Sequence, residues 1–219
     1  WGAEEMEWGS VTFGAFLGIA AVFGVLSLAL YPVIRRDFLL WATVRTLCFV
    51  IMSIALFPLE LPAIFPAGEL RIDVGEIALS LAIGSTGPFL ATYIENRPRF
   101  ARVRFWLYKL FALGVVGGLA TALAPVWPWL DRVHDILILV MILGLIAGLA
   151  IAVRAGSRAA QYQAVGYAPL IIIALLVLAY ELGTGEPVTY WPVAALFAVL
   201  IDFIVTAAGV IAGRPLCTS

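Results

Sequence analysis

Long runs of apolar residues, separated by short polar segments, dominate the chain. A helix needs about 20 apolar residues to cross the hydrocarbon core of a bilayer, and irregular backbone cannot face lipid. Runs of this length therefore predict membrane-spanning helices. Seven helices are expected, over residues 11–34, 38–59, 75–94, 105–123, 133–153, 162–182 and 191–213.

The composition agrees with this pattern and excludes a soluble domain. Of the 219 residues, 63% belong to the hydrophobic set and only 12% are charged. An ordinary soluble domain has about 45–50% apolar and about 25% charged residues. The two cysteines, Cys48 and Cys217, provide no disulfide framework. We therefore expect an all-α membrane protein built as a bundle of seven transmembrane helices.

The charges between the apolar runs predict how the bundle is oriented. Basic residues gather after the first, third, fifth and seventh runs, and acidic residues gather before the first run and in the other loops. Because positively charged short loops stay on the cytoplasmic side, we expect the N-terminus outside and the C-terminus inside. The basic residues concerned are Arg35, Arg36, Arg97, Arg99, Arg102, Arg104, Arg154, Arg158 and Arg214.

The same pattern divides the chain into three parts. Residues 1–10 are expected to form a periplasmic stub, residues 11–213 the seven-helix transmembrane domain, and residues 214–219 the start of a cytoplasmic linker. The chain begins with Trp1 and stops directly after the seventh run. We therefore expect it to be a piece of a longer protein.

Two charged residues, Arg45 and Asp202, lie well inside apolar runs. A charge at the centre of a membrane helix costs roughly 2.5–3.5 kcal/mol on an insertion scale, so each of them requires a partner. At helical rise, Arg45 lies about 13 Å from Arg36 and Asp202 about 18 Å from Arg214, each measured from the inner end of its helix. The long arginine side chain can span this difference in depth, so the two residues can meet. The pair is interpreted either as a fixed ion pair that orients two helices, or as a switch or ligand-binding group.

A second group of polar residues is expected at the outer ends of the helices. Converging polar groups above a bundle can bind a small cation or a polar ligand, but solvated helix ends explain the same residues and are the favoured interpretation. The group consists of Glu76, Asp131, His134, Asp135 and Glu181.

Small and helix-bending residues suggest where helices bend. Gly84, Gly87 and Pro88 interrupt the third run, and Pro169 lies in the sixth. A proline kink or hinge is the favoured interpretation, and a broken helix that lines a transport path is the alternative.

Glycines also repeat every four residues in three of the runs. Such stripes let helix backbones approach closely, so we expect them to pack inside the bundle, with a subunit interface as the alternative. They are Gly14 and Gly18 in the first run, Gly114 and Gly118 in the fourth, and Gly144 and Gly148 in the fifth.

The residue inventory argues against catalysis. His134 is the sole histidine, so the sequence offers no multi-histidine metal site, bis-histidine haem site or Ser–His pair. A retinal protein needs a Schiff-base lysine in its last helix, whereas the only lysine, Lys109, lies in the fourth run. We therefore expect no enzyme activity, cofactor or metal in this segment.

Several short motifs resemble a bacterial family, the seven-transmembrane receptors with diverse intracellular signalling modules (7TMR-DISM). The first run contains Gly-Ala-Phe-Leu-Gly at 14–18 and Leu-Ala-Leu-Tyr at 28–31, followed by an Arg-Arg-Asp turn at 35–37. The turn Arg-Ala-Gly-Ser-Arg-Ala at 154–159 and the closing run from Tyr190 to Arg214 are also similar to the family. The family's last helix often carries a glutamate where this chain has Asp202.

The resemblance implies a receptor or transducer in the bacterial inner membrane. It implies a periplasmic sensor domain before Trp1 and a cytoplasmic output domain, such as a diguanylate cyclase or histidine kinase, after Arg214. It also implies homodimerisation. Membrane lipid is an expected partner, nucleic acid is not, and the residues do not indicate the ligand. A small-molecule or ion transporter (permease) and a passive membrane anchor remain the alternatives.

Overall fold

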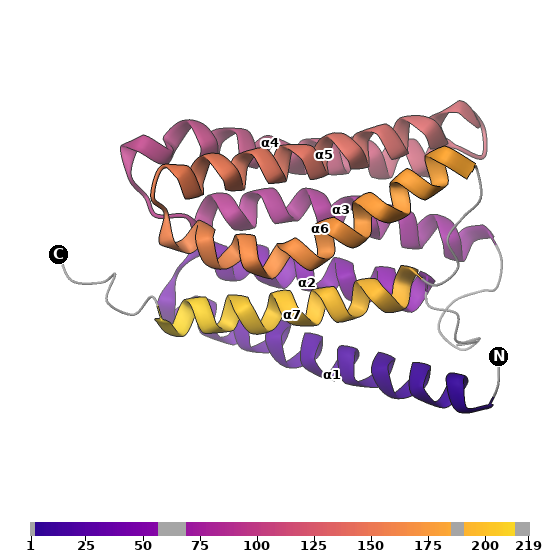
Figure 1. The fold of residues 1–219 in the computed structure, drawn as a ribbon, viewed down its shortest axis with the longest axis horizontal. Helices are drawn as coiled ribbons and strands as arrows, with labels where there is room; N and C mark the ends of the chain where they lie inside the picture. Colours follow the sequence, from indigo (N-terminus) through magenta and orange to yellow (C-terminus); the bar gives the residue numbers. More distant parts are fainter. Residues whose placement is uncertain (1–2, 57–68, 185–190, 213–219) are drawn as a thin grey trace.

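The computed structural model describes residues 3–56, 69–184 and 191–212, and this part of the chain is helical throughout apart from short turns. The helices lie side by side as a bundle (Figure 1). They are α1 (Ala3–Ile34), α2 (Asp37–Leu56), α3 (Glu69–Tyr93), α4 (Ala101–Leu123), α5 (Trp129–Arg154), α6 (Arg158–Thr184) and α7 (Trp191–Ala212), with a short 3-10 turn, η1 (Pro98–Phe100), before α4. The prediction of an all-α membrane bundle is confirmed.

The lengths of these helices fit a membrane. Six of them, α1 to α6, are long and apolar enough to cross a bilayer. In α7 the apolar segment found is the shorter Phe197–Thr206, because the side chains at both ends of this helix lie outside the described part. The chain is a multi-pass membrane protein. The start of α1 and the end of α7 lie at opposite ends of the bundle (Figure 1), and the terms inner and outer below follow the predicted orientation.

Helix α3 lies at the centre of the bundle and α1 at its edge. Helix α3 packs closely against α2 and α4 and also contacts α5 and α6, whereas α1 packs mainly on α2 and α7. In their apolar windows, 67% of the residues of α3 are buried but only 22% of those of α1. Most of the surface of α1 therefore faces lipid.

Glycines allow the backbones of α3 and α4 to touch. A methyl group added at Gly84 would lie 2.9 Å from the Cα atom of Gly114, and one added at Gly87 would lie 2.2 Å from the carbonyl oxygen of Leu107. Helix α3 continues through this stretch and through Pro88. Gly84 and Gly87 therefore serve close helix packing, which needs no Cβ at these positions.

The small residues of α1 behave differently. A methyl group added at Gly14 or Gly18 would meet nothing within 4 Å, so the expectation that this pair packs inside the bundle is wrong. The reason is that α1 uses another face, with Phe16 and Ala20, for its contacts with the bundle. The expected packing is found for the glycines of α4 and α5, namely Gly114, Gly118, Gly144 and Gly148.

The inner turn between α5 and α6 is held by the carboxylate of Glu95. Glu95 follows α3 and accepts hydrogen bonds from the Ser157 hydroxyl and from the backbone N–H groups of Arg158 (3.1 Å) and Ala159 (3.4 Å). These are free donors at the start of α6, where a negative charge is favourable. Partial burial opposes ionisation of Glu95, but these hydrogen bonds outweigh it and lower its pKa below the ordinary 4.5.

Replacing Gly87 by alanine should destabilise the bundle. The added methyl would collide with backbone rather than with a flexible side chain, and such overpacking costs about 1–3 kcal/mol. Gly14→Ala is the matched control, because its methyl meets nothing and alanine is the better helix former by about 0.5–1 kcal/mol. Unfolding by sodium dodecyl sulfate in mixed micelles measures both variants. Equal stability of the two variants would contradict the packing described.

Neutralising Glu95 should remove part of the pH dependence of stability. Because folding lowers its pKa, the Glu95 carboxylate contributes stability that is complete above about pH 4.5 and is lost as the pH falls through the lowered value. Glu95→Gln should therefore melt earlier than the wild type at pH 7, and this difference should shrink at pH 3–4. Asp37→Asn, which removes an exposed acid of the same end, is the control. A difference that is independent of pH would contradict the assignment.

Candidate functional site

Arg45 of α2 and Asp202 of α7 form an ion pair in the interior of the bundle. Nη2 of Arg45 lies 3.0 Å from Oδ2 of Asp202, and both residues are 0% exposed. Each residue is the charge that interrupts an otherwise apolar helix, and the fold brings these two together. The contact fixes α7 to α2, two helices that otherwise share few contacts.

Aromatic rings surround the guanidinium group of Arg45. The centroid of the Phe89 ring lies 4.3 Å from its central carbon, and those of Tyr167 and Phe203 lie at 5.5 Å and 5.9 Å. Nη1 of Arg45 also donates a hydrogen bond to the Tyr167 hydroxyl. Cation–π attraction is stronger where water is absent, so these rings stabilise the charge deep in the bundle.

A chain of hydrogen bonds extends from Asp202 to α6. The Thr206 hydroxyl donates to Oδ1 of Asp202 at 3.3 Å, and Nε2 of Gln163 donates to the Thr206 oxygen at 2.9 Å. Both residues are buried. Together with the Arg45–Tyr167 bond, this chain joins α2, α6 and α7 through polar side chains. We call Arg45, Gln163, Tyr167, Asp202 and Thr206 the polar network.

The polar network is only partly satisfied. Nε of Arg45, Oε1 of Gln163 and the hydroxyl of the neighbouring Thr46 are buried without a hydrogen-bond partner. The contact between Nη2 and Oδ2 is close, but its geometry is not that of a hydrogen bond. Unpaired polar atoms are costly in an apolar interior. The network therefore keeps capacity for a further polar partner or for a second set of bonds.

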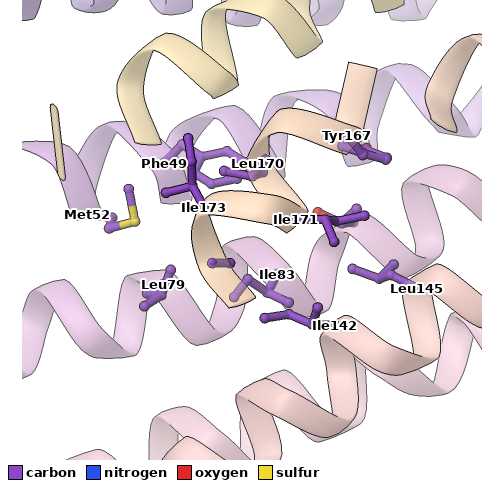
Figure 2. Close-up of a pocket in the computed structure, with 12 residues that line it drawn as sticks. Phe49, Met52, Leu79, Ile83, Ile142, Leu145, Tyr167, Leu170, Ile171 and Ile173 are labelled. Carbon is purple, nitrogen blue, oxygen red and sulfur yellow. The ribbon is translucent and has the colours of Figure 1, made fainter. Parts of the chain in front are cut away.

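A cavity of about 70 Å³ lies on one side of the polar network, between α2, α3, α5 and α6. Tyr167 closes one end of it, and apolar side chains line most of the rest (Figure 2). The Thr86 hydroxyl at its wall is already bonded to the carbonyl of Ala82. Apolar cavities of this kind stay dry, so the cavity is free space beside α6. Its lining includes Phe49, Met52, Leu79, Ile83, Ile142 and Leu145.

A larger groove of about 530 Å³ lies on the other side, between α1, α2 and α7. Phe89, Phe203 and Thr206 are among the residues that line it. The two rings flank Arg45, and Thr206 belongs to the polar network. The polar network therefore lies between an apolar cavity and a larger groove.

Pro169 divides α6 into two halves. Gln163 and Tyr167, on its inner side, belong to the polar network, whereas Leu170 and Ala174, on its outer side, line the cavity. Figure 1 shows a change of direction along α6, and proline inside a helix is a common cause of such a bend.

The outer polar group is brought together in part. Glu76 at the outer part of α3 lies within electrostatic range of Asp131, His134 and Asp135 of α5. Nδ1 of His134 lies 3.6 Å from a carboxylate oxygen of Asp135, and its Nε2 is buried without a partner. The side chain of Glu181 lies outside the described residues. Within the described ranges, His, Cys, Asp and Glu form no group of three or more that could hold a metal ion.

Comparison with known families decides which kind of protein this is. A family model described as 7TM diverse intracellular signalling matches residues 9–212. The chain belongs to this family. Its members are membrane signalling receptors, and the fold is that of a signalling transmembrane domain rather than a known catalytic fold. No curated protein and no solved structure matches the chain.

The site of this 7TM diverse intracellular signalling domain contains residues that sequence reasoning missed. Gln163, Tyr167 and Phe89 were not singled out, because neither an amide nor an aromatic ring interrupts an apolar run as a charge does. One signal was present, since Gln163 and Tyr167 are polar residues one helical turn apart in the sixth run.

Removing either partner of the ion pair should destabilise the domain strongly. Arg45→Met leaves Asp202 unpaired and Asp202→Asn leaves Arg45 unpaired, and breaking a buried pair costs about 3–5 kcal/mol. In the double variant no charge remains unpaired. Its loss should therefore be smaller than the sum of the single losses by about 1–3 kcal/mol. Unfolding in mixed micelles measures this cycle, and additive losses would contradict a direct interaction.

Proposed function

We propose that this bundle transmits a signal from the periplasmic side of the bacterial inner membrane to a cytoplasmic output domain that follows the chain. The output domain implied by the family resemblance is a diguanylate cyclase or a histidine kinase, acting as a homodimer. Membership of a signalling receptor family supports the receptor role. The observation that carries the mechanism is the Arg45–Asp202 pair, because it links α7, the last helix, to α2 through two buried charges.

The mechanism is an exchange between two packings of the bundle. Two such states need differ by only a few kcal/mol for a ligand or an outer domain to shift their populations. The unpaired atoms of Arg45 and Gln163 supply the hydrogen-bonding capacity that a second arrangement requires. Without these unpaired atoms, a movement of α7 would break hydrogen bonds of the polar network and form none in their place.

Helix α6 supplies the connection to the outer side. Its outer half lines a dry cavity into which it can move, and its inner half carries Tyr167 and Gln163. An outer event that displaces the outer half therefore changes the contacts of Arg45 and Thr206. Because Arg45 is paired with Asp202 of α7 and Thr206 belongs to α7, the change reaches the last helix.

Removing the charge of Asp202 should shift α7 in the folded protein. Spin labels at Ala101 of α4 and Ala208 of α7, with Cys48 and Cys217 replaced by serine, report the distance between the inner ends of these helices. Asp202→Asn should move the mean distance by on the order of 1–2 Å, as helix shifts in switching proteins do. The control is Thr121→Val, because Thr121 is a buried threonine of α4 outside the polar network.

Three results would contradict the proposed function. The first is an unchanged α4–α7 distance in a folded Asp202→Asn variant. The second is an unchanged regulated output of the full-length gene product carrying Arg45→Gln. The third is flux of a solute through proteoliposomes that depends on Asp202, since this would favour the permease.

A further inference from the structure

Helix α4 carries three basic residues and no acidic one. Arg104 is bonded to the inner end of α3, because its Nε donates to the carbonyl of Ala91 at 2.6 Å and its Nη1 donates to the Asn96 side chain. Arg102 and Lys109 are exposed and form no salt bridge within the part of the chain that the structure describes. An unpaired charge on a membrane helix requires a partner, and the described bundle supplies none for these two.

Arg102 and Lys109 share one face of α4 with two aromatic rings. Residues 102, 105, 106 and 109 follow one another at helical spacing, so they lie on the same side of the helix. Phe105 and Trp106 are 58% and 60% exposed, so this side is turned away from the bundle and toward lipid. Farther along α4 the exposed residues of this side are apolar, as at Val116.

The side chain of Lys109 is directed toward the inner end of α4. Its Nζ lies 4.5 Å from the centroid of the Phe105 ring and 4.7 Å from that of the Trp106 ring. Both rings belong to the turn that precedes Lys109, and Arg102 belongs to the turn before that. Lysine side chains reach toward the membrane surface in this way. The two unpaired cations therefore lie along the same short stretch, at the inner edge of the lipid-facing side of α4.

The charges on this stretch indicate the chemistry of the missing partner. Two cations on one face attract an anion, and phosphate oxygens accept hydrogen bonds from both guanidinium and ammonium groups. In a zwitterionic headgroup, a cationic group cancels the charge of the phosphate, so only a headgroup with a net negative charge neutralises the pair. Because the apolar side chains beyond Lys109 face lipid, the partner also carries acyl chains.

We propose that this face of α4 is a binding site for an anionic phospholipid. The phosphate lies between Arg102 and Lys109, and an acyl chain lies along the apolar side of α4 toward Val116. The rings of Phe105 and Trp106 hold the ammonium group of Lys109 at the height of the headgroup. The site uses no residue of the polar network, so it does not rest on the proposed function.

The test is quenching of Trp106 fluorescence by brominated lipids, with the whole chain in nanodiscs. The nanodiscs contain phosphatidylglycerol, which is anionic, and phosphatidylcholine, which is zwitterionic, in equal amounts. Bromine is placed on the acyl chains of one lipid or of the other. Because the chain has 7 tryptophans, the signal of Trp106 is the difference between the wild type and Trp106→Phe, a substitution that keeps an aromatic ring beside Lys109.

Brominated phosphatidylglycerol should quench Trp106 more strongly than brominated phosphatidylcholine. Lys109→Gln and Arg102→Gln should each lower the relative affinity for phosphatidylglycerol about fivefold, the contribution of one basic residue near an anionic membrane surface. Lys109→Arg keeps the charge and should keep the preference. Arg158→Gln is the matched control, because it removes an exposed arginine at the inner start of α6 and should leave the preference unchanged.

Three outcomes would overturn the inference. One is equal quenching of Trp106 by the two brominated lipids, which would show that Lys109 reaches toward any headgroup. Another is an equal loss of preference in Arg158→Gln and Lys109→Gln, which would show a diffuse effect of surface charge. The third is absence of quenching by either lipid, which would show that a second copy of the chain covers this face.

Discussion

The cost of placing an ionised group in hydrocarbon is the constraint on which the interior of this bundle depends. Arg45 is fully buried, so the fold surrounds it with a carboxylate, a phenol and aromatic rings from three helices, α3, α6 and α7. These groups must stay close to one another, and the helices that carry them are positioned accordingly. The interaction between Arg45 and Asp202 is also sensitive to their separation, because a small displacement of one charge changes a large electrostatic energy. A buried ion pair thus stands where an ordinary membrane helix would carry apolar side chains.

Two kinds of helix packing are found in the molecule, one tight and one loose. Between α3 and α4, glycines bring backbone against backbone and leave no space for movement. Around α6 and α1, by contrast, a cavity and a groove remain. Tightly packed interiors transmit displacement, whereas voids permit it. In the proposed mechanism, the α3–α4 pair is the fixed part against which α6 and α7 change position.

The sequence predicts the helices well and the site only in part. Apolar runs locate all seven helices, because a membrane requires continuous helical hydrogen bonding. Most helix ends agree closely with the prediction, but α1 and α3 begin earlier than predicted, at Ala3 and Glu69. Arg45 and Asp202 can be found because charges in such runs are rare. Gln163, Tyr167 and Phe89 cannot be assigned in this way, since their contacts depend on the rotation of each helix about its axis. Gly14 and Gly18 show the same limit: a glycine repeat shows that close approach is possible, but it does not show which face of the helix is used.

The capping of α6 by Glu95 has a consequence for how motion is distributed along that helix. Three hydrogen bonds hold its first turn to the residue that follows α3, and the polar network holds the next two turns. Beyond Pro169, Leu170, Ile171 and Ala174 border free space. Local opening is least costly where such attachments are few. Amide protons of α6 should accordingly exchange along a gradient, slowest near the capped turn and faster beyond Pro169, where the helix borders the cavity.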